Sequence, residues 1–111
     1  MPFAKFVTID IGSISAAATK EESWESDGDY QVRRIYIVEK TGASLYRVEI
    51  TVRKDADLLT RDYVPAVLIT HLNNLNPELN VPVAKGQKLV FGIKNNEATA
   101  RELYAVLELW T

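Results

Sequence analysis

The sequence feature that most constrains the fold is a strict alternation of apolar and polar residues in LYRVEITVR, residues 45–53 of a 111-residue chain. One face of this stretch carries Tyr46, Val48, Ile50 and Val52, and the other carries Arg47, Glu49, Thr51 and Arg53. A period of two residues, with many β-branched side chains, is typical of a β-strand that has one face in water. We therefore expect a strand here, with its apolar face in the core.

Similar patterns along the rest of the chain predict about seven strands in total. The clearest are FAKFVTIDI (3–11), YQVRRIYIVEK (30–40), VPVAKGQKLVFGIKNN (81–96) and the closing run (100–110). Strands and helices do not alternate, which argues against a parallel sheet. The patterns predict one all-β domain over residues 1–111. It would be an antiparallel β-sandwich with one short helix at 66–72, where Pro65 suits the first helical turn.

Two local arrangements are also expected. Residues 30–53 resemble a hairpin, because two strand patterns flank the turn KTGAS, in which Gly42 supplies an unusual backbone conformation. In FAKFVTIDI, the side chains of Phe3, Val7, Ile9 and Ile11 would share one side of a strand, with Lys5 interrupting them.

The closing run RELYAVLELWT, residues 101–111, is apolar on both faces. As a strand it would carry Leu103, Ala105, Leu107 and Leu109 on one face, and Tyr104, Val106 and Trp110 with Glu102 and Glu108 on the other. Three interpretations are open: a strand partly covered by a loop, a buried helix, or a strand whose second face is buried by another subunit. Aromatic residues amid charges are typical of an interface core with a polar rim, which favours the third.

The sequence contains no recognisable catalytic or metal-binding constellation, so we expect no enzyme activity and no cofactor. Cysteine is absent, and the sequence has a single histidine, His71. No Gly-x-Ser-x-Gly motif is present to supply a nucleophilic serine for it. The 13 basic and 15 acidic residues are scattered, which argues against binding nucleic acid. No apolar stretch approaches the roughly 20 residues of a membrane-spanning helix. A signal peptide is not visible either, which predicts a cytoplasmic site of synthesis and no membrane partner.

Two weaker site hypotheses concern acidic turns and aromatic side chains. Hard cations such as calcium take oxygen ligands, and two turns offer carboxylates: Glu25, Asp27 and Asp29, and Asp55, Asp57 and Asp62. Turns favour aspartate in any case, so no metal site is predicted. Exposed Trp and Tyr side chains could instead form a flat sugar-binding platform, as in carbohydrate-binding β-sandwich modules.

The order of segments resembles the single jelly-roll structural proteins of bacterial and archaeal viruses, which include capsid and capsid-decorating subunits. A strand of small residues leads to the tryptophan of the dipeptide SW, residues 23–24. The segments YQVRRIYIVEKTG and SLYRVEITVR follow it. After an irregular crossing come LNVPVAKGQKLVFGIKNN and the final apolar strand. The most suggestive piece is PVAKGQKLVFGIKNNE, residues 82–97, in which a Gly-Lys turn leads to a strand that ends at Asn.

The resemblance implies a jelly-roll sandwich that works by shape, without catalysis. Its partners would be further copies of itself and other proteins of a virus particle, assembled in the host cytoplasm. The residues expected to pack between subunits are Tyr104, Val106 and Trp110, with Trp24 as a further candidate. The alternative is a carbohydrate-binding β-sandwich module.

Overall fold

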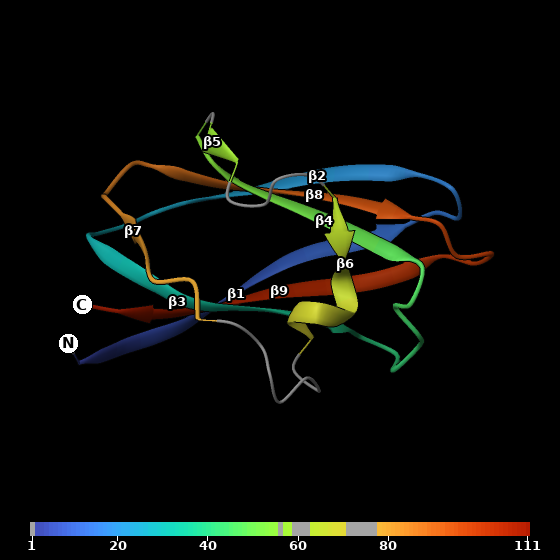
Figure 1. Ribbon diagram of the computed structural model, residues 1–111, viewed down its shortest axis with the longest axis horizontal. Coiled ribbons are helices and arrows are strands. Elements are labelled where there is room, and N and C mark those ends of the chain that lie inside the picture. Colours follow the sequence, from blue (N-terminus) through green and yellow to red (C-terminus); the bar gives the residue numbers. More distant parts are fainter. Residues whose placement is uncertain (1, 56, 59–62, 71–77) are drawn as a thin grey trace.

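The computed structural model describes residues 2–55, 57–58, 63–70 and 78–111, and consists of two antiparallel sheets packed face to face (Figure 1). One 3-10 turn, η1 (Ala66–Ile69), lies where a short helix was expected. The all-β sandwich prediction is therefore confirmed. In chain order the strands are β1 (Phe3–Ile14), β2 (Thr19–Glu25), β3 (Tyr30–Glu39), β4 (Val48–Lys54), β5 (Asp57–Leu58), β6 (Val64–Pro65), β7 (Val81–Val83), β8 (Lys88–Asn95) and β9 (Arg101–Trp110).

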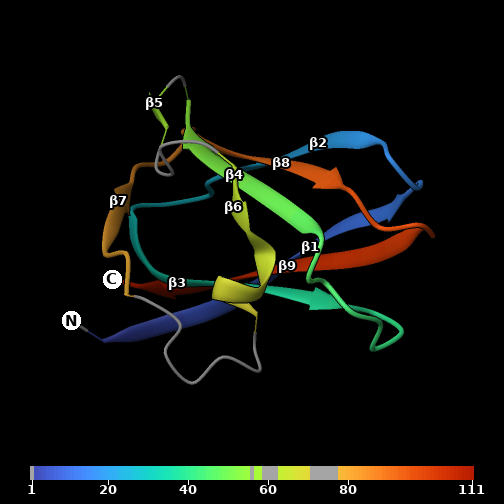
Figure 2. The same ribbon diagram turned by 45° about the vertical axis from the view of Figure 1, so that its right-hand side comes forward.

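The strand order is that of a jelly roll. Sheet A has the order β1-β9-β3-β7, and sheet B has the order β2-β8-β4-β5, with β6 also paired to β4. Each strand of the first half thus pairs antiparallel with one of the second half: β1 with β9, β2 with β8, β3 with β7, and β4 with β5. This pairing is typical of a jelly roll, and Figures 1 and 2 show the two layers that the strands form.

The predicted hairpin over residues 30–53 is wrong. β3 belongs to sheet A and β4 to sheet B, so residues 40–47 cross from one sheet to the other. Gly42 does adopt a positive φ of 78°, but it turns the chain within this crossing. The buried side chain of Leu45 anchors the crossing to the core. Two strand patterns and a glycine turn fit a hairpin and a crossing equally well, because local sequence does not state which strand is the partner.

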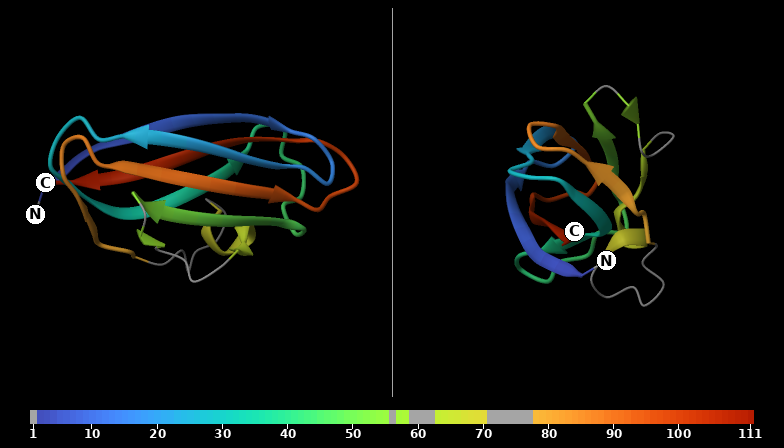
Figure 3. Two further views of the ribbon diagram at one scale, coloured as in Figure 1. Left: turned by 90° about the horizontal axis from the view of Figure 1, so that it is seen from above. Right: turned by 90° about the vertical axis from the view of Figure 1, so that its left-hand side faces the viewer.

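The closing run forms β9, a strand between β1 and β3 at the centre of sheet A. Its inward side chains, Leu103, Ala105, Leu107 and Leu109, are all fully buried. The helix interpretation of this run is therefore wrong, and the strand interpretation is confirmed. The end-on view in Figure 3 shows both termini at one end of the sandwich, where the Thr111 N–H donates to the Pro2 carbonyl at 3.0 Å.

An irregularity near the start of β1 changes which side chains face the core. The register with β9 shifts between Phe3, opposite Trp110, and Lys5, opposite Leu109. The prediction that Phe3 shares a side with Val7 is therefore wrong, because the shift moves Phe3 to the outer face. Lys5 takes the inward position and donates to the Asp27 carboxylate at 2.8 Å at the edge of the sandwich.

Candidate functional site

The two outer faces of the sandwich differ in chemistry. The outer face of sheet B carries mainly charged and hydroxyl side chains on β2, β8 and β4, and Arg53 forms an ion pair with Glu21 at 3.2 Å across it. The outer face of sheet A instead carries aromatic and aliphatic side chains on β1, β9 and β3. We call this set the sheet A patch; it consists of Phe3, Phe6, Tyr36, Val38, Tyr104, Val106 and Trp110.

The register of sheet A makes the patch continuous. Val106 on β9 lies opposite Tyr36 on β3, and Tyr104 lies opposite Val38. On the other side of β9, Phe6 lies opposite Glu108. Phe6 is 59% exposed, the highest value in the patch. A shallow apolar hollow of ≈ 380 Å³ lies at the centre, lined by Phe6, Tyr36, Val38 and Val106.

Aromatic contacts hold one end of the patch. The rings of Phe3 and Phe6 lie 5.0 Å apart, and Phe3 meets Trp110 edge to face at 5.8 Å. The guanidinium of Arg33 lies 4.3 Å from the centre of the Trp110 ring. Such tilted and edge-to-face pairs favour a fixed geometry over a mobile one.

A buried carboxylate lies inside the patch. Glu108 is 8% exposed, and it accepts hydrogen bonds from the Tyr36 hydroxyl at 3.0 Å and from the Trp110 indole N–H at 2.8 Å. Arg34 forms an ion pair with it at 3.5 Å. Burial, and then the hydrogen bond to this carboxylate, raise the pKa of the Tyr36 hydroxyl. Glu108 thus fixes two aromatic side chains of the patch, and its charge is compensated.

At the other end, the charges beside the patch are also paired. Lys40 donates to the Asp10 carboxylate at 2.7 Å, and its ammonium lies 4.4 Å from the centre of the Tyr104 ring. This hydrogen bond lowers the pKa of Asp10 and raises the pKa of Lys40. The apolar centre is therefore bordered by charges of both signs that are already in contact with each other.

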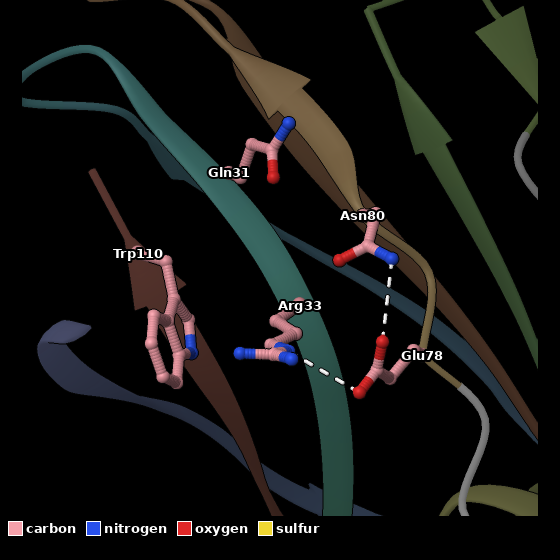
Figure 4. A pocket seen from close by; sticks show the side chains of 5 residues that line it. All are labelled: Gln31, Arg33, Glu78, Asn80 and Trp110. Carbon is pink, nitrogen blue, oxygen red and sulfur yellow. Dashed lines mark hydrogen bonds and ion pairs between the residues drawn. The ribbon is translucent and has the colours of Figure 1, made fainter. Parts of the chain in front are cut away.

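A polar cleft adjoins the Trp110 end of the patch (Figure 4). It has a volume of ≈ 400 Å³ and is lined by Gln31, Arg33, Glu78, Asn80 and Trp110. Arg33 lies between the indole ring and the Glu78 carboxylate, to which it donates at 3.3 Å. The hydrogen bond from Asn80, together with the charge of Arg33, lowers the pKa of Glu78.

The structure brings three of the four predicted interface residues together. Tyr104, Val106 and Trp110 all lie on the outer face of β9, half-buried, within the sheet A patch. Trp24 does not join them. It lies on β2 in sheet B, opposite Leu89, and packs against the core.

Sequence reasoning missed the patch residues on the neighbouring strands. Phe6, Tyr36 and Val38 belong to the patch only because β1 and β3 flank β9, and local sequence does not reveal that adjacency. A signal was nevertheless present: apolar residues occupy both alternating sets of positions in YQVRRIYIVEK, as they do in the closing run.

Three carboxylates of the acidic turns form interactions within the protein. Asp27 pairs with Lys5, Asp29 accepts from the Lys85 N–H at 3.0 Å, and Asp55 accepts from the Lys88 N–H at 3.2 Å. Among the described residues no three metal-ligating side chains gather into a group. Asp62 and His71 lie outside the described residues.

Several aromatic rings that could contact a sugar have a cation over one face. Within the described part of the chain these pairs are Lys5 with Tyr30, Arg33 with Trp110, Lys40 with Tyr104 and Lys94 with Tyr63, at 4.3 to 5.9 Å. A sugar stacking on one of those faces would have to displace the cation.

Comparison with known protein families and curated sequences identifies no relative from which a function could be inferred. No model of a known protein family matches the chain, and no curated protein sequence matches it. In the portion of the chain that the structure describes, none of the helices is both long and apolar enough to cross a bilayer.

Proposed function

We propose that this chain is a non-enzymatic structural protein that self-associates through the sheet A patch. The observation that carries the proposal is the contrast between the two outer faces: sheet A gathers aromatic and aliphatic side chains among its paired charges, whereas sheet B carries mainly charged and hydroxyl side chains. A large contiguous apolar patch is unusual on a monomer in water and commonly marks an interaction site. An apolar centre with a charged border is also the usual anatomy of a protein interface.

The jelly-roll strand order supports a narrower proposal, that the assembly is a virus or phage particle. Viral capsid domains are among the proteins that use double-sheet jelly rolls, although lectin domains use them too. A fold alone does not determine function. The proposal that the chain belongs to a virus or phage particle is supported by the resemblance described above and by the sheet A patch. It includes subunits that form the shell and subunits that decorate it.

The direct test is the solution mass of the purified protein, measured by light scattering after size exclusion across a concentration series. We expect a dimer or a larger defined species. Phe6→Lys places a charge on the most exposed patch residue, and should weaken association at least about tenfold because a buried aromatic anchor is lost.

Ser23→Lys provides the matched control, since Ser23 is exposed on the outer face of sheet B. It should leave the mass unchanged. Circular dichroism of both variants establishes that they are folded. A folded wild-type protein that stays monomeric at the highest concentration would contradict the proposal.

The polar cleft favours a second candidate, a carbohydrate-binding module. The planar polar side chains of Arg33, Glu78 and Asn80 beside an indole are groups that can bind sugar hydroxyls. The Arg33 guanidinium over the Trp110 ring makes this candidate weaker. Titration calorimetry with polysaccharides tests it: binding by a monomer, lost in Glu78→Ala, would favour this function over self-association.

A further inference from the structure

The sheet A patch contains a ridge and a hollow side by side. The ridge consists of Phe3 and Phe6 on the edge strand β1, which are 46% and 59% exposed and whose tilted rings have their centres 5.0 Å apart. The hollow lies over β9 and β3, where Tyr36, Val38 and Val106 are half-buried, and Phe6 forms one of its walls. One face therefore offers both a protrusion and a recess of the same apolar chemistry.

We propose that two copies pack these faces together about a two-fold axis, so that the ridge of each copy enters the hollow of the other. The inference rests on the proposed self-association and specifies its geometry. A two-fold contact uses the same surface on both subunits and must be self-complementary. A head-to-tail contact needs two separate surfaces, whereas here ridge and hollow are too close together to serve two different neighbours.

The charges beside the patch favour a second copy over a strongly charged partner. Asp10 is paired with Lys40, and Glu108 with Arg34. Glu102 is exposed on the same face near Lys40. Because most of the charges beside the patch are paired within each subunit, two identical faces can approach with little repulsion between like charges. A strongly acidic or basic partner would meet no large excess of the opposite charge beside the sheet A patch.

The packing of two such faces follows ordinary sheet geometry. Sheets that pack face to face lie about 10 Å apart, with their side chains interdigitated. A phenylalanine side chain from one sheet can therefore reach the far side of the gap and contact the backbone level of the other. The Tyr36 ring, which lines the hollow, is held by its hydrogen bond to Glu108, so this wall of the hollow is ordered before a partner arrives.

Crosslinking tests the arrangement cleanly, because the chain has no cysteine. Thr8→Cys lies on the outer face of β1 next to the ridge, and Val38→Cys lies in the wall of the hollow. The two single variants are mixed, allowed to exchange subunits, and treated with a short bis-maleimide. We expect the mixture to give several-fold more crosslinked dimer than either variant alone, because the proposed contact brings Thr8 of one copy toward Val38 of the other.

Ser23→Cys mixed with Val38→Cys is the control, and should give only background crosslinking. Light scattering on the wild-type protein should give a mass of two subunits, or a multiple that dissociates through dimers. A defined trimer or pentamer, or association without preferential crosslinking in the first mixture, would overturn the two-fold packing and leave self-association standing. A strict monomer would overturn both.

Discussion

At the scale of single residues, two buried polar side chains hold the turns that let the chain roll up. Asn95, fully buried at the end of β8, donates to the carbonyls of Ile14 and Thr99 and accepts from the Glu97 N–H. It therefore joins the β1–β2 and β8–β9 connections. The sequence predicted a strand that ends at Asn, and β8 ends at Asn95, but the sequence did not disclose the partners of this side chain.

Glu39 plays the corresponding role in the crossing between the sheets. Its carboxylate accepts hydrogen bonds from the Thr41 hydroxyl and from the backbone N–H groups of Thr41, Ala43 and Glu102. Burial acts to raise the pKa of Glu39, but the hydrogen bonds outweigh it, so the pKa lies below its ordinary value of 4.5. The ionised form is thus the one that the fold stabilises.

Glu39→Gln should lower the free energy of unfolding at pH 7 by about 1 to 3 kcal/mol, because a neutral amide cannot accept these bonds equally well. A carboxyl group with a lowered pKa contributes fully above its ordinary pKa, and this contribution is lost as the pH falls through the lowered pKa. Urea denaturation of both proteins from pH 7 down to pH 3 measures the difference. It should shrink below pH 4.5, and a difference independent of pH would contradict the assignment.

At the scale of secondary-structure elements, the position of β9 in the centre of sheet A explains why the closing run is apolar on both faces. One face belongs to the core and the other belongs to the sheet A patch, at neighbouring positions of the same strand. The alternation predicted this division correctly. The hairpin prediction and the placement of Phe3 were wrong because pairing partners and register shifts depend on contacts distant in sequence.

Two substitutions on β9 should separate stability from association. Leu107→Ala removes a fully buried side chain and should cost about 2 to 5 kcal/mol in unfolding free energy. Val106→Ala, next to it on the outer face, should cost the isolated subunit about 1 kcal/mol or less, but should weaken association. Denaturation at low protein concentration and sedimentation at high concentration measure the two effects. Equal effects of both variants on association would contradict the division of faces.

At the scale of the whole molecule, the rolled topology makes the two sheets depend on each other. Successive long strands β1, β2, β3 and β4 alternate between sheets A and B, so neither sheet is made from one continuous piece of chain. Each sheet therefore needs the chain that forms the other. We expect the domain to unfold as a single cooperative unit, as small domains usually do.

The two tryptophans can report on this cooperativity, since Trp24 lies in sheet B and Trp110 in sheet A. Trp24→Phe and Trp110→Phe leave one fluorescent probe in each sheet. Within each variant, the urea transition seen by fluorescence should coincide with the transition seen by circular dichroism. A fluorescence transition that precedes the loss of β-structure in either variant would mean that one sheet opens separately.

The register shifts of β1 have a consequence for the kind of object this protein can build. β1 ends the order of sheet A, and an edge strand of this length is ordinarily a template on which further chains can polymerise. The shifts at Phe3/Lys5 and Asp10/Gly12 leave only a short regular run, and Lys5 places a charge at an inward position. These shifts disfavour open-ended growth into fibres by strand addition at β1. The proposed two-fold packing through the sheet A patch would instead close on itself and stop at a finite size.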